Sequence, residues 1–388
     1  MDVFLFIFLV LLFTYAVLID YYRRAWNQIP DFESNDSIPA TIISIIIAVR
    51  NEENNIEALL LSLSQQSYPK NLFQVIVVDD HSEDETWNKL SQFNPGGLST
   101  LFTRLSDHTN EEQIILSHKK KAIETGIKLA KGTLIVTTDA DCIFPTDWLL
   151  TIARFYEKTS AKFIAAPVKI TAPSSLLSVF QTLDFLTLQG ITGASVFKRI
   201  HSMCNGANLA YEKAAFEEVD GFMGIDDIPS GDDMMLMHKI YKKYPERVSY
   251  LKSSAAIIST AAVSSWKQFF HQRIRWASKS DSYDDKRIMS VLLLVYLVNV
   301  CFLILGIAAF FSTTWLFFFI LLLLAKILIE FPFVHTVAAF FRQQSLLKYF
   351  LLLQPLHIAY TLIAGWLGKF GSFEWKGRRI KNKANFNL

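Results

Sequence analysis

Long apolar segments at both ends of the chain constrain its fold more than any other feature of the sequence. One segment opens the chain and three follow a polar middle region: Val3–Ile19, Ser290–Phe311, Thr314–Ile329 and Leu346–Leu367. Each is long enough, or nearly so, for a helix that spans a bilayer. The pattern predicts an N-terminal transmembrane anchor at 1–24, a globular domain at 40–280, two or three transmembrane helices at 288–370 and a basic cytosolic tail at 371–388.

Basic residues beside the apolar segments predict the orientation of the chain. Arg23 and Arg24 follow the first segment, and further basic residues crowd the tail: Lys369, Lys376, Arg378, Arg379, Lys381 and Lys383. By the positive-inside rule, both the globular domain and the tail face the cytosol. The first segment has neither the basic start nor the cleavage site of a signal peptide. We therefore expect a multi-pass protein of the cell (inner) membrane, with one C-terminal segment lying along the interface or re-entering.

Charge and cysteine content argue against other classes of protein. The formal net charge is only +2, which is not the footprint of a nucleic-acid-binding protein. Cys142, Cys204 and Cys301 lack the spacing of a metal site, so we expect reduced thiols. We interpret three histidines as hydrogen-bonded structural residues: His81, His201 and His271.

The globular domain begins with strands and helices in alternation. Thr41–Val49 is a continuous apolar run, as in a strand buried on both faces of a parallel sheet. A helix around Ile56–Leu63, a strand at Phe73–Val78, two more helices and a strand at Thr133–Val136 follow. This rhythm predicts an α/β fold with a doubly wound, mostly parallel sheet, whose ligands bind beyond the carboxyl ends of the strands.

Two acidic groups stand where these strands end. Asp79-Asp80 closes one strand, and Asp139-Ala140-Asp141 follows another. Carboxylates of this kind suit Mg²⁺ or Mn²⁺, which keep open positions for the phosphates of a ligand. Neither a glycine-rich dinucleotide fingerprint nor a Walker loop follows any of these strands. The sequence therefore predicts a divalent metal that neutralises a phosphate-bearing ligand.

Six ordered motifs give the chain a resemblance to a known family. They are Ile46–Glu53, Val77–Thr86, Lys119-Lys120, Thr138–Asp141, Gly231–Asp233 and Gln272–Trp276. Together they resemble the motif set of the family 2 glycosyltransferases. The flanking apolar segments resemble the integral-membrane branch that holds ceramide glucosyltransferases and processive polysaccharide synthases. The resemblance implies a GT-A fold, a nucleoside-diphosphate sugar donor, a divalent metal and inversion at the anomeric carbon.

The resemblance assigns the nucleoside end of the donor to the loops after the first two strands. Val49, Asn51 and Glu52 resemble the segment that contacts uracil and ribose. Asp80 resembles the carboxylate that holds the base.

The diphosphate and the metal are assigned to later motifs. Lys119 or Lys120 would meet the diphosphate. Asp139 and Asp141 resemble the Asp-x-Asp pair, with Asp141 as the direct metal ligand and Asp139 nearer the donor sugar or ribose. A metal and a basic side chain would stabilise the charge that develops on the leaving diphosphate.

Asp233 is the candidate general base, and Asp232 stands where the family usually has Glu. An inverting single displacement needs a carboxylate to take the proton of the acceptor hydroxyl. The alternative is that these carboxylates only mark the N-terminus of a helix, where the dipole favours acidic residues.

Gln272, Arg275 and Trp276 resemble the Gln-x-x-Arg-Trp motif. Arg275 would bind diphosphate and Trp276 would stack on the acceptor. The segment Trp266–Lys279 also has the composition of an amphipathic helix at a membrane surface, and both interpretations can hold together.

The expected function is metal-dependent transfer of a hexose from a nucleotide sugar, most simply a UDP-sugar, to a lipid-linked or other membrane-associated glycan acceptor. Because there is a single N-terminal apolar segment, we favour addition of one sugar or a few over a processive polysaccharide synthase. A non-catalytic pseudoenzyme partner is a further alternative. A nucleotidyltransferase would show a glycine-rich, basic signature near the first strand, which Ala48–Glu53 lacks.

Overall fold

The computed structural model describes residues 2–33, 39–109, 115–171, 173–228, 230–279, 284–375 and 378–381. The chain divides into two compact units. We call Pro30–Thr171 with Ser202–Ala261 the sheet unit, and Met1–Ile29 with Ala172–His201 and Ala262–Leu388 the helical unit.

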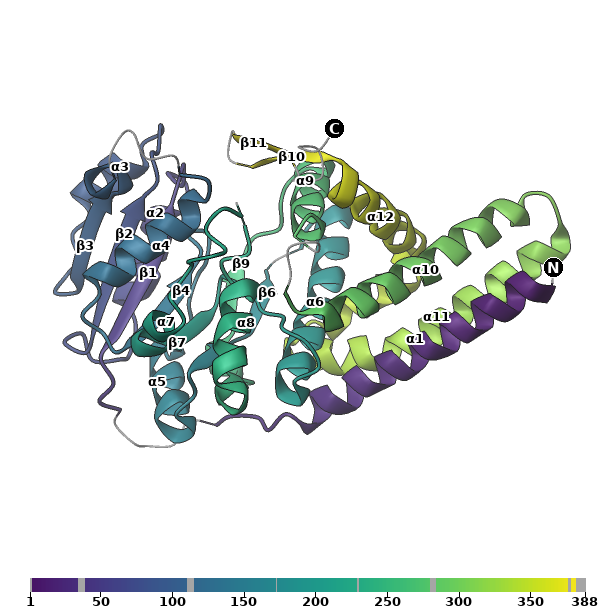
Figure 1. Cartoon of the computed structure of the whole chain (residues 1–388), viewed down its shortest axis with the longest axis horizontal. Coiled ribbons are helices and arrows are strands. Elements are labelled where there is room, and N and C mark those ends of the chain that lie inside the picture. The colour runs from purple at the N-terminus through teal and green to yellow at the C-terminus, as the bar shows by residue number, and fades with distance from the viewer. Residues whose placement is uncertain are drawn as a thin grey trace. The chain divides into compact units, whose positions relative to one another are not determined.

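The sheet unit is built on seven strands in the order β3-β2-β1-β4-β7-β5-β8. Their bounds are β1 (Ile43–Val49), β2 (Phe73–Asp79), β3 (Ser99–Arg104), β4 (Leu134–Thr138), β5 (Phe163–Ala165), β7 (Leu209–Glu212) and β8 (Val248–Tyr250). The strands β3, β2, β1 and β4 are mutually parallel (Figure 1). Strand β7 runs antiparallel between β4 and β5. The predicted α/β fold with a mostly parallel sheet is confirmed.

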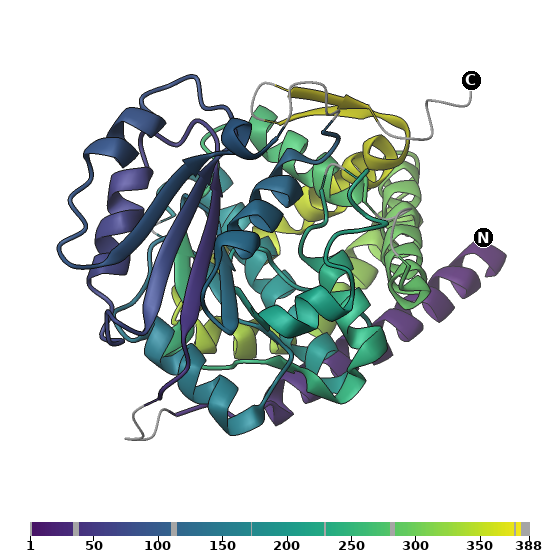
Figure 2. The ribbon, with the colours of Figure 1, turned by 60° about the vertical axis from the view of Figure 1, so that its left-hand side comes forward.

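Helices connect these strands. They are α2 (Ile56–Ser64), α3 (Thr86–Gln92), α4 (His118–Leu129), α5 (Trp148–Thr159), α7 (Lys213–Glu218) and α8 (Met234–Lys243), with short 3-10 turns at Leu105–His108, Pro245–Arg247 and Ser254–Ala256. Helix α4 packs on β1 and β2 (Figure 2). Its approach is close at Gly126, where a Cβ would lie 2.5 Å from Ile46 Cγ2. This glycine lets α4 lie close to the sheet.

Strand β4 extends further than its apolar run predicts. Thr137 and Thr138 continue the ladder opposite Ile46 and Ile47 of β1, whereas the predicted strand ended at Val136. β-Branched threonine suits a strand as well as valine does. The strand therefore ends directly at Asp139.

A second, two-stranded parallel sheet pairs β6 (Val168–Ile170) with β9 (Ile258–Thr260). Ile143 forms an isolated bridge with Ser259 of β9. The segment after Asp141 is thereby tied to β9.

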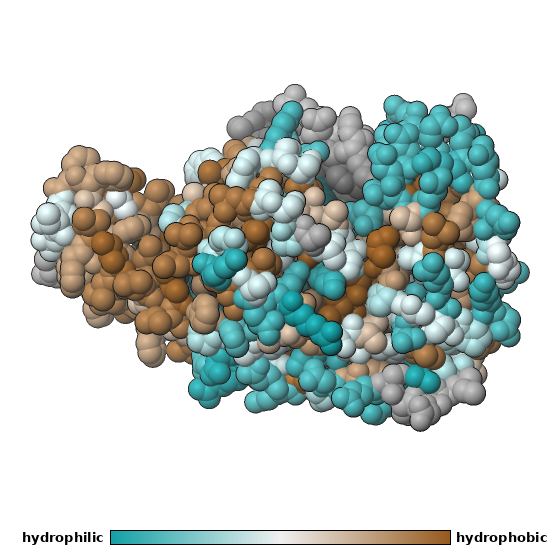
Figure 3. All heavy atoms as spheres, turned by 180° about the vertical axis from the view of Figure 1, so that it is seen from behind, coloured by the Kyte–Doolittle hydropathy of each residue, from teal (hydrophilic) through white to brown (hydrophobic). Residues whose placement is uncertain are grey.

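The helical unit contains the apolar segments. Its elements are α1 (Asp2–Gln28), α6 (Leu176–Lys198), α9 (Trp266–Ala277), α10 (Lys286–Ala309), α11 (Thr313–Phe340), a 3-10 turn (Gln344–Tyr349), α12 (Phe350–Phe370), β10 (Ser372–Trp375) and β11 (Arg378–Lys381). Among the described residues, four helices are long and apolar enough to cross a membrane: Val3–Gln28, Lys286–Ala309, Thr313–Phe340 and Gln344–Phe370. In Figure 3 the surface of the long helices, on the left, is mostly brown.

Helices α11 and α12 continue through two prolines, one just beyond the apolar segment Thr314–Ile329 and one within Leu346–Leu367. Pro332 lies inside α11, which runs on to Phe340, and Pro355 lies inside α12. Apolar helices tolerate proline where neighbouring groups satisfy the freed backbone. How many of these helices cross, and which side the tail occupies, stays a prediction. Two of the tail's basic residues, Lys376 and Lys383, lie outside the described part of the chain.

A buried polar network joins α1, α11 and α12 within the helical unit. Lys326 Nζ lies 2.6 Å from Glu330 Oε1, one turn along α11, and donates to Gln354 Oε1 of α12 at 2.6 Å. Gln354 Nε2 donates to Glu330 Oε2 at 2.8 Å. Tyr15 of α1 donates to Glu330 Oε1 at 2.5 Å. The ion pair is thus enclosed by partners from two other helices.

Candidate active site

The register of the parallel strands gathers the predicted donor residues at one edge of the sheet. Val49, the last residue of β1, is opposite Asp79 of β2, and Ile47 is opposite Thr138 of β4. Asp80 donates its backbone N–H to the carbonyl of Val49 at 2.8 Å. Asp80 and Asp139 therefore both lie just beyond the carboxyl ends of these strands, where ligands of such sheets bind.

Asn51 and Glu52 bind the loop after β1 to the loop after β2. Asn51 has a left-handed φ of 51°; its N–H donates to Ser82 Oγ at 3.0 Å, and its Oδ1 accepts from the N–H of Glu83 at 2.9 Å. The N–H of Glu52 donates to Thr86 Oγ1 at 2.7 Å. These contacts give the two residues a definite role in shaping the loop. Their contact with a nucleoside stays a prediction.

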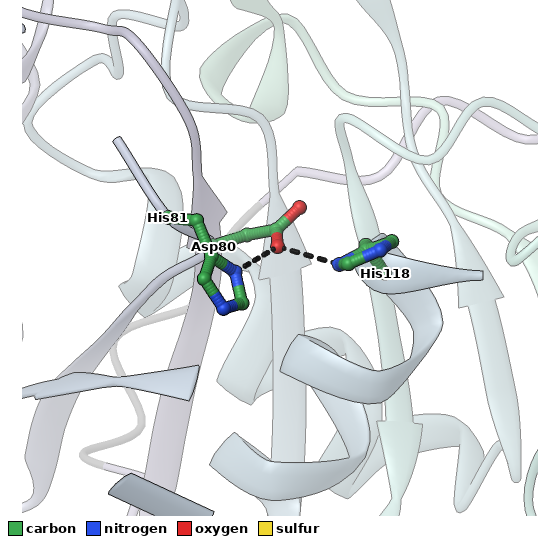
Figure 4. A group of neighbouring side chains, drawn as sticks. All are labelled: Asp80, His81 and His118. Carbon is green, nitrogen blue, oxygen red and sulfur yellow. Dashed lines mark hydrogen bonds and ion pairs between the residues drawn. The ribbon is translucent and has the colours of Figure 1, made fainter. Parts of the chain in front are cut away.

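Two histidines contact the Asp80 carboxylate (Figure 4). His81 Nδ1 lies 2.9 Å and His118 Nδ1 2.8 Å from the same oxygen, Asp80 Oδ1. Asp80 is buried, with 4% of its side chain exposed. The interpretation of His81 as a hydrogen-bonded residue agrees with this contact. His118 did not emerge from the sequence, although its place directly before Lys119 at a helix start is a signal that could have been used.

Lys119 lies between the two acidic motifs. Its Nζ is 2.8 Å from Asp139 Oδ1 and 3.1 Å from Asp232 Oδ2. Burial disfavours the charged ammonium, but Asp139, Asp232 and Asp233 outweigh this effect and raise the pKa of Lys119 well above its ordinary value. The structure thus places the charged ammonium of Lys119 near three predicted site carboxylates, those of Asp139, Asp232 and Asp233.

Lys120 has different partners. Its side chain is 2% exposed, and its Nζ donates to the carbonyls of Ile225, Ile228 and Ser230 at 2.6, 2.8 and 3.0 Å. The backbone it holds leads directly into Asp232 and Asp233. Lys119 thus contacts two predicted site carboxylates, and Lys120 holds the backbone that leads to Asp232.

Asp139 and Asp141 flank the buried Ala140 and are themselves accessible. Asp141 Oδ2 accepts from Thr260 Oγ1 of β9 at 3.2 Å, and Cys142 Sγ lies 3.7 Å from Asp141 Oδ1. Burial and the neighbouring carboxylates raise the pKa of the Cys142 thiol well above its usual range. The donors offered here are therefore carboxylate oxygens, which fit Mn²⁺ or Mg²⁺.

Asp233 is held at the N-terminus of α8. Its Oδ1 accepts the N–H of Met234 at 2.8 Å, so it caps the helix, and its Oδ2 accepts the N–H of Gly206 at 3.2 Å. The capping role foreseen as the alternative is thus present in the structure. A capped carboxylate still has lone pairs for another proton, so this role does not exclude catalysis.

Gln272, Arg275 and Trp276 lie on α9 in the helical unit and are half-buried. The neighbouring Arg273 is buried. Its Nη2 lies 2.7 Å from Asp184 Oδ2, and its guanidinium lies 4.2 Å from the centre of the Trp276 ring. A charged group can be buried in this way because an opposite charge and an aromatic face compensate it. The predicted diphosphate and acceptor contacts of this motif stay predictions.

Comparison with known proteins decides the family. The model for "Glycosyl transferase family 2" matches residues 44–220, and the model for "Glycosyl transferase family group 2" matches residues 134–367. The chain belongs to the family 2 glycosyltransferases. It has a GT-A-like fold together with long apolar helices.

Curated proteins are similar to parts of this glycosyltransferase. It is 28% identical over 180 residues to glycosyltransferase AglE of Haloferax volcanii, covering 46% of this chain and 55% of that protein. It is 28% identical over 126 residues to a beta-monoglucosyldiacylglycerol synthase of Trichormus variabilis, covering 32% and 25%. The match thus spans only part of the length of these curated relatives.

A solved structure supports the fold over nearly the whole chain. The mannosyltransferase PcManGT from Pyrobaculum calidifontis, in complex with GDP-Man and Mn²⁺, has a TM-score of 0.56 and 18% identity, covering 95% of this chain and 98% of that one. The predicted GT-A fold is confirmed.

Proposed function

We propose that this glycosyltransferase transfers one sugar, or a few, from a UDP-sugar to the hydroxyl group of a lipid-linked acceptor at a membrane surface. The observation that carries the proposal is the position of Lys119 between Asp139 and Asp232, which joins the Asp-x-Asp motif to the motif of the candidate base. Lys119 can therefore bind the donor diphosphate in the same site in which the candidate base meets the acceptor.

The donor would lie along the carboxyl edge of the sheet. Asp80 would accept a hydrogen bond from the base, and the loop of Val49, Asn51 and Glu52 would flank the nucleoside. Lys119 would approach the diphosphate, exchanging part of its contact with Asp139 for a phosphate oxygen. Its charge would then stabilise the leaving group as the glycosidic bond breaks.

Asp139 and Asp141 would hold a divalent cation, with Asp141 as the direct ligand because its carboxylate is the more exposed. Bound there, Mn²⁺ or Mg²⁺ would supply further positive charge for the departing diphosphate. PcManGT, which shares the fold, was solved with Mn²⁺. Calorimetry tests this part, because Asp141→Asn should weaken the binding of UDP in the presence of Mn²⁺. UDP binding that needs no metal and is unchanged in the variant would contradict the metal role.

Asp233 would take the proton of the acceptor hydroxyl while that oxygen attacks the anomeric carbon from the face opposite the diphosphate. The proton passes to the carboxylate, the new glycosidic bond forms, and the bond to the diphosphate oxygen breaks. Backbone N–H groups from Gly206 and Met234 fix the orientation of this carboxylate. Asp232 is paired with Lys119 and would balance the positive charge of that lysine beside Asp233.

A lipid-linked acceptor is favoured by the four apolar helices and by the exposed apolar surface that they carry. One relative is a beta-monoglucosyldiacylglycerol synthase, whose named product is a glycolipid. A headgroup hydroxyl rising from a bilayer would reach a cytosolic site that receives its donor from water. The amphipathic helix α9, with Trp266 exposed, is suited to the headgroup layer.

The proposal is tested with full-length protein in detergent, a panel of labelled UDP-sugars with GDP-mannose, and a membrane lipid extract. We expect labelled product that partitions into organic solvent as a glycolipid of one or a few sugars. Long water-soluble polymer would instead show a processive synthase. Absence of transfer with every donor, in a protein that still binds nucleotide, would favour the pseudoenzyme.

A further inference from the structure

The contact of two imidazoles with one carboxylate oxygen is not explained by sugar transfer. Asp80 Oδ1 has His81 Nδ1 at 2.9 Å and His118 Nδ1 at 2.8 Å, and the three donor atoms lie within 4.8 Å of one another. Figure 4 shows His81 and His118 on opposite sides of the Asp80 carboxylate. We propose that Asp80, His81 and His118 form a binding site for a transition-metal ion such as Zn²⁺.

The set of donor atoms selects the class of ion. Imidazole nitrogen suits Zn²⁺, Cu²⁺, Ni²⁺ and Fe²⁺, whereas Mg²⁺ prefers oxygen ligands alone. Three protein ligands with one open position are the usual arrangement of an accessible zinc site. This group therefore differs in preference from Asp139 and Asp141, which offer only carboxylates.

The donor atoms must rearrange to receive the ion. With metal–nitrogen bonds of about 2.0–2.1 Å, the donor atoms of a tetrahedral site lie roughly 3.3 Å apart. The present contacts between Asp80 and each histidine are shorter than this by about half an ångström, as expected when protons rather than a metal join the groups. His81 is 45% and His118 26% exposed at the side chain, so both rings can rotate.

The backbone holds these residues in place independently of the side-chain contacts. His81 has a left-handed φ of 57°, a conformation that costs free energy in a residue other than glycine. Arg50 Nη1 stabilises this turn by donating to the carbonyls of Asp80 and His81 at 2.9 and 2.7 Å. His118 begins α4, which Gly126 fixes against β1. The three ligands are thus presented by two anchored segments.

Binding of an ion here would occupy the carboxylate that we assign to the nucleotide base. This consequence rests on the proposed function, because it assumes that Asp80 holds the base. Zn²⁺ and the nucleotide would then exclude each other. The ion would be an inhibitor of donor binding, in contrast to a metal at Asp139 and Asp141, which would support it.

The test is a titration of chelator-treated, full-length protein in detergent with Zn²⁺ alone, followed by Co²⁺ as a spectroscopic probe of its ligands. We expect saturable binding of Zn²⁺ by the wild type. In His118→Gln the Kd for Zn²⁺ should rise by more than about 100-fold, since losing even an outer-shell partner costs roughly 10–100-fold. Glutamine can still donate to Asp80, so the variant should keep its fold.

One control variant makes the result specific. His108→Gln removes an exposed histidine of the sheet unit whose Nε2 lies 2.8 Å from Thr103 Oγ1, and it should leave Zn²⁺ binding unchanged. Failure of the wild type to bind, or equal binding by His118→Gln, would overturn the metal site.

The nucleotide measurement separates this inference from the proposed function. Saturating Zn²⁺ should raise the Kd for UDP at least about tenfold in the wild type and leave it unchanged in His118→Gln. Zn²⁺ binding without any effect on UDP would leave the metal site standing and would show instead that Asp80 does not hold the base.

Discussion

At the residue scale, Asp233 combines a structural task with the catalytic one that we propose. Its carboxylate caps α8 and accepts the N–H of Gly206. A test of catalysis must therefore preserve the cap. Asparagine is as good an N-cap as aspartate, so Asp233→Asn removes the basic carboxylate and keeps the helix start.

We expect Asp233→Asn to bind UDP as the wild type does and to lose transfer by about 100-fold or more, the usual scale for a positioned base. Initial rates and calorimetry on the same preparation measure the two quantities. Asp233→Ala serves as the comparison for the cap, because it should also lower the free energy of unfolding by about 1 kcal/mol. Equal loss of binding and transfer in the asparagine variant would assign Asp233 to structure alone.

Lys119 gives a prediction about pH. Its neighbours raise its pKa above the ordinary lysine value of about 10.4, so folding favours the charged form. The stabilisation is complete below the unfolded pKa and is lost only as pH rises through the higher folded pKa. The rate ratio of wild type to Lys119→Gln should therefore stay constant between about pH 6 and pH 9. Lys119→Arg should restore part of the rate, and a ratio that falls toward alkaline pH would show that Lys119 loses its proton in this range.

At the element scale, α4 carries both His118 and Lys119 to the edge of the sheet, and its position depends on a single close contact. Gly126 faces Ile46 of β1, a branched side chain with little room to move. We expect Gly126→Ala to push the helix outward and cost about 1–3 kcal/mol of stability, as overpacking does. Transfer should fall as well, because Lys119 shifts with the helix.

Thermal unfolding and initial rates of Gly126→Ala check this prediction. The control is Lys128→Ala, on the exposed face of the same helix, where loss of the contact with Glu124 should cost well under about 1 kcal/mol. A Gly126→Ala variant as stable and active as the control would show that α4 is not held by this contact.

The elements also show what the sequence can predict. Strand β1 was predictable because its apolar run is continuous, and the place of Asp139 followed from the strand before it. The antiparallel insertion of β7 was not predictable, since Leu209–Glu212 is short and its pairing with β4 joins distant parts of the chain. The three carbonyl partners of Lys120 and the contact of His118 with Asp80 were unpredictable for the same reason. The local sequence pattern predicts which residues are buried, whereas these contacts depend on the topology of the chain.

At the scale of the whole molecule, the proposal requires a cytosolic sheet unit. The three native cysteines are buried, so an introduced cysteine can be labelled selectively. Gln92→Cys, on exposed α3, should react with a membrane-impermeant maleimide only after cell lysis. Thr313→Cys, at the exposed first residue of α11, should react in intact cells if α10 crosses the membrane. Labelling of Gln92→Cys from outside would reverse the predicted orientation.

The ion pair inside α11 has a consequence for the synthesis of the chain. A lone charge at the centre of a membrane helix costs about 2.5–3.5 kcal/mol on insertion scales. Because Lys326 and Glu330 are one turn apart, α11 would bring its own counter-ion into a membrane and could leave the translocon without waiting for another helix. Tyr15 is made first and Gln354 last. A nascent chain that stops before α12 would therefore hold a half-coordinated pair, and arrival of the final helix would complete it.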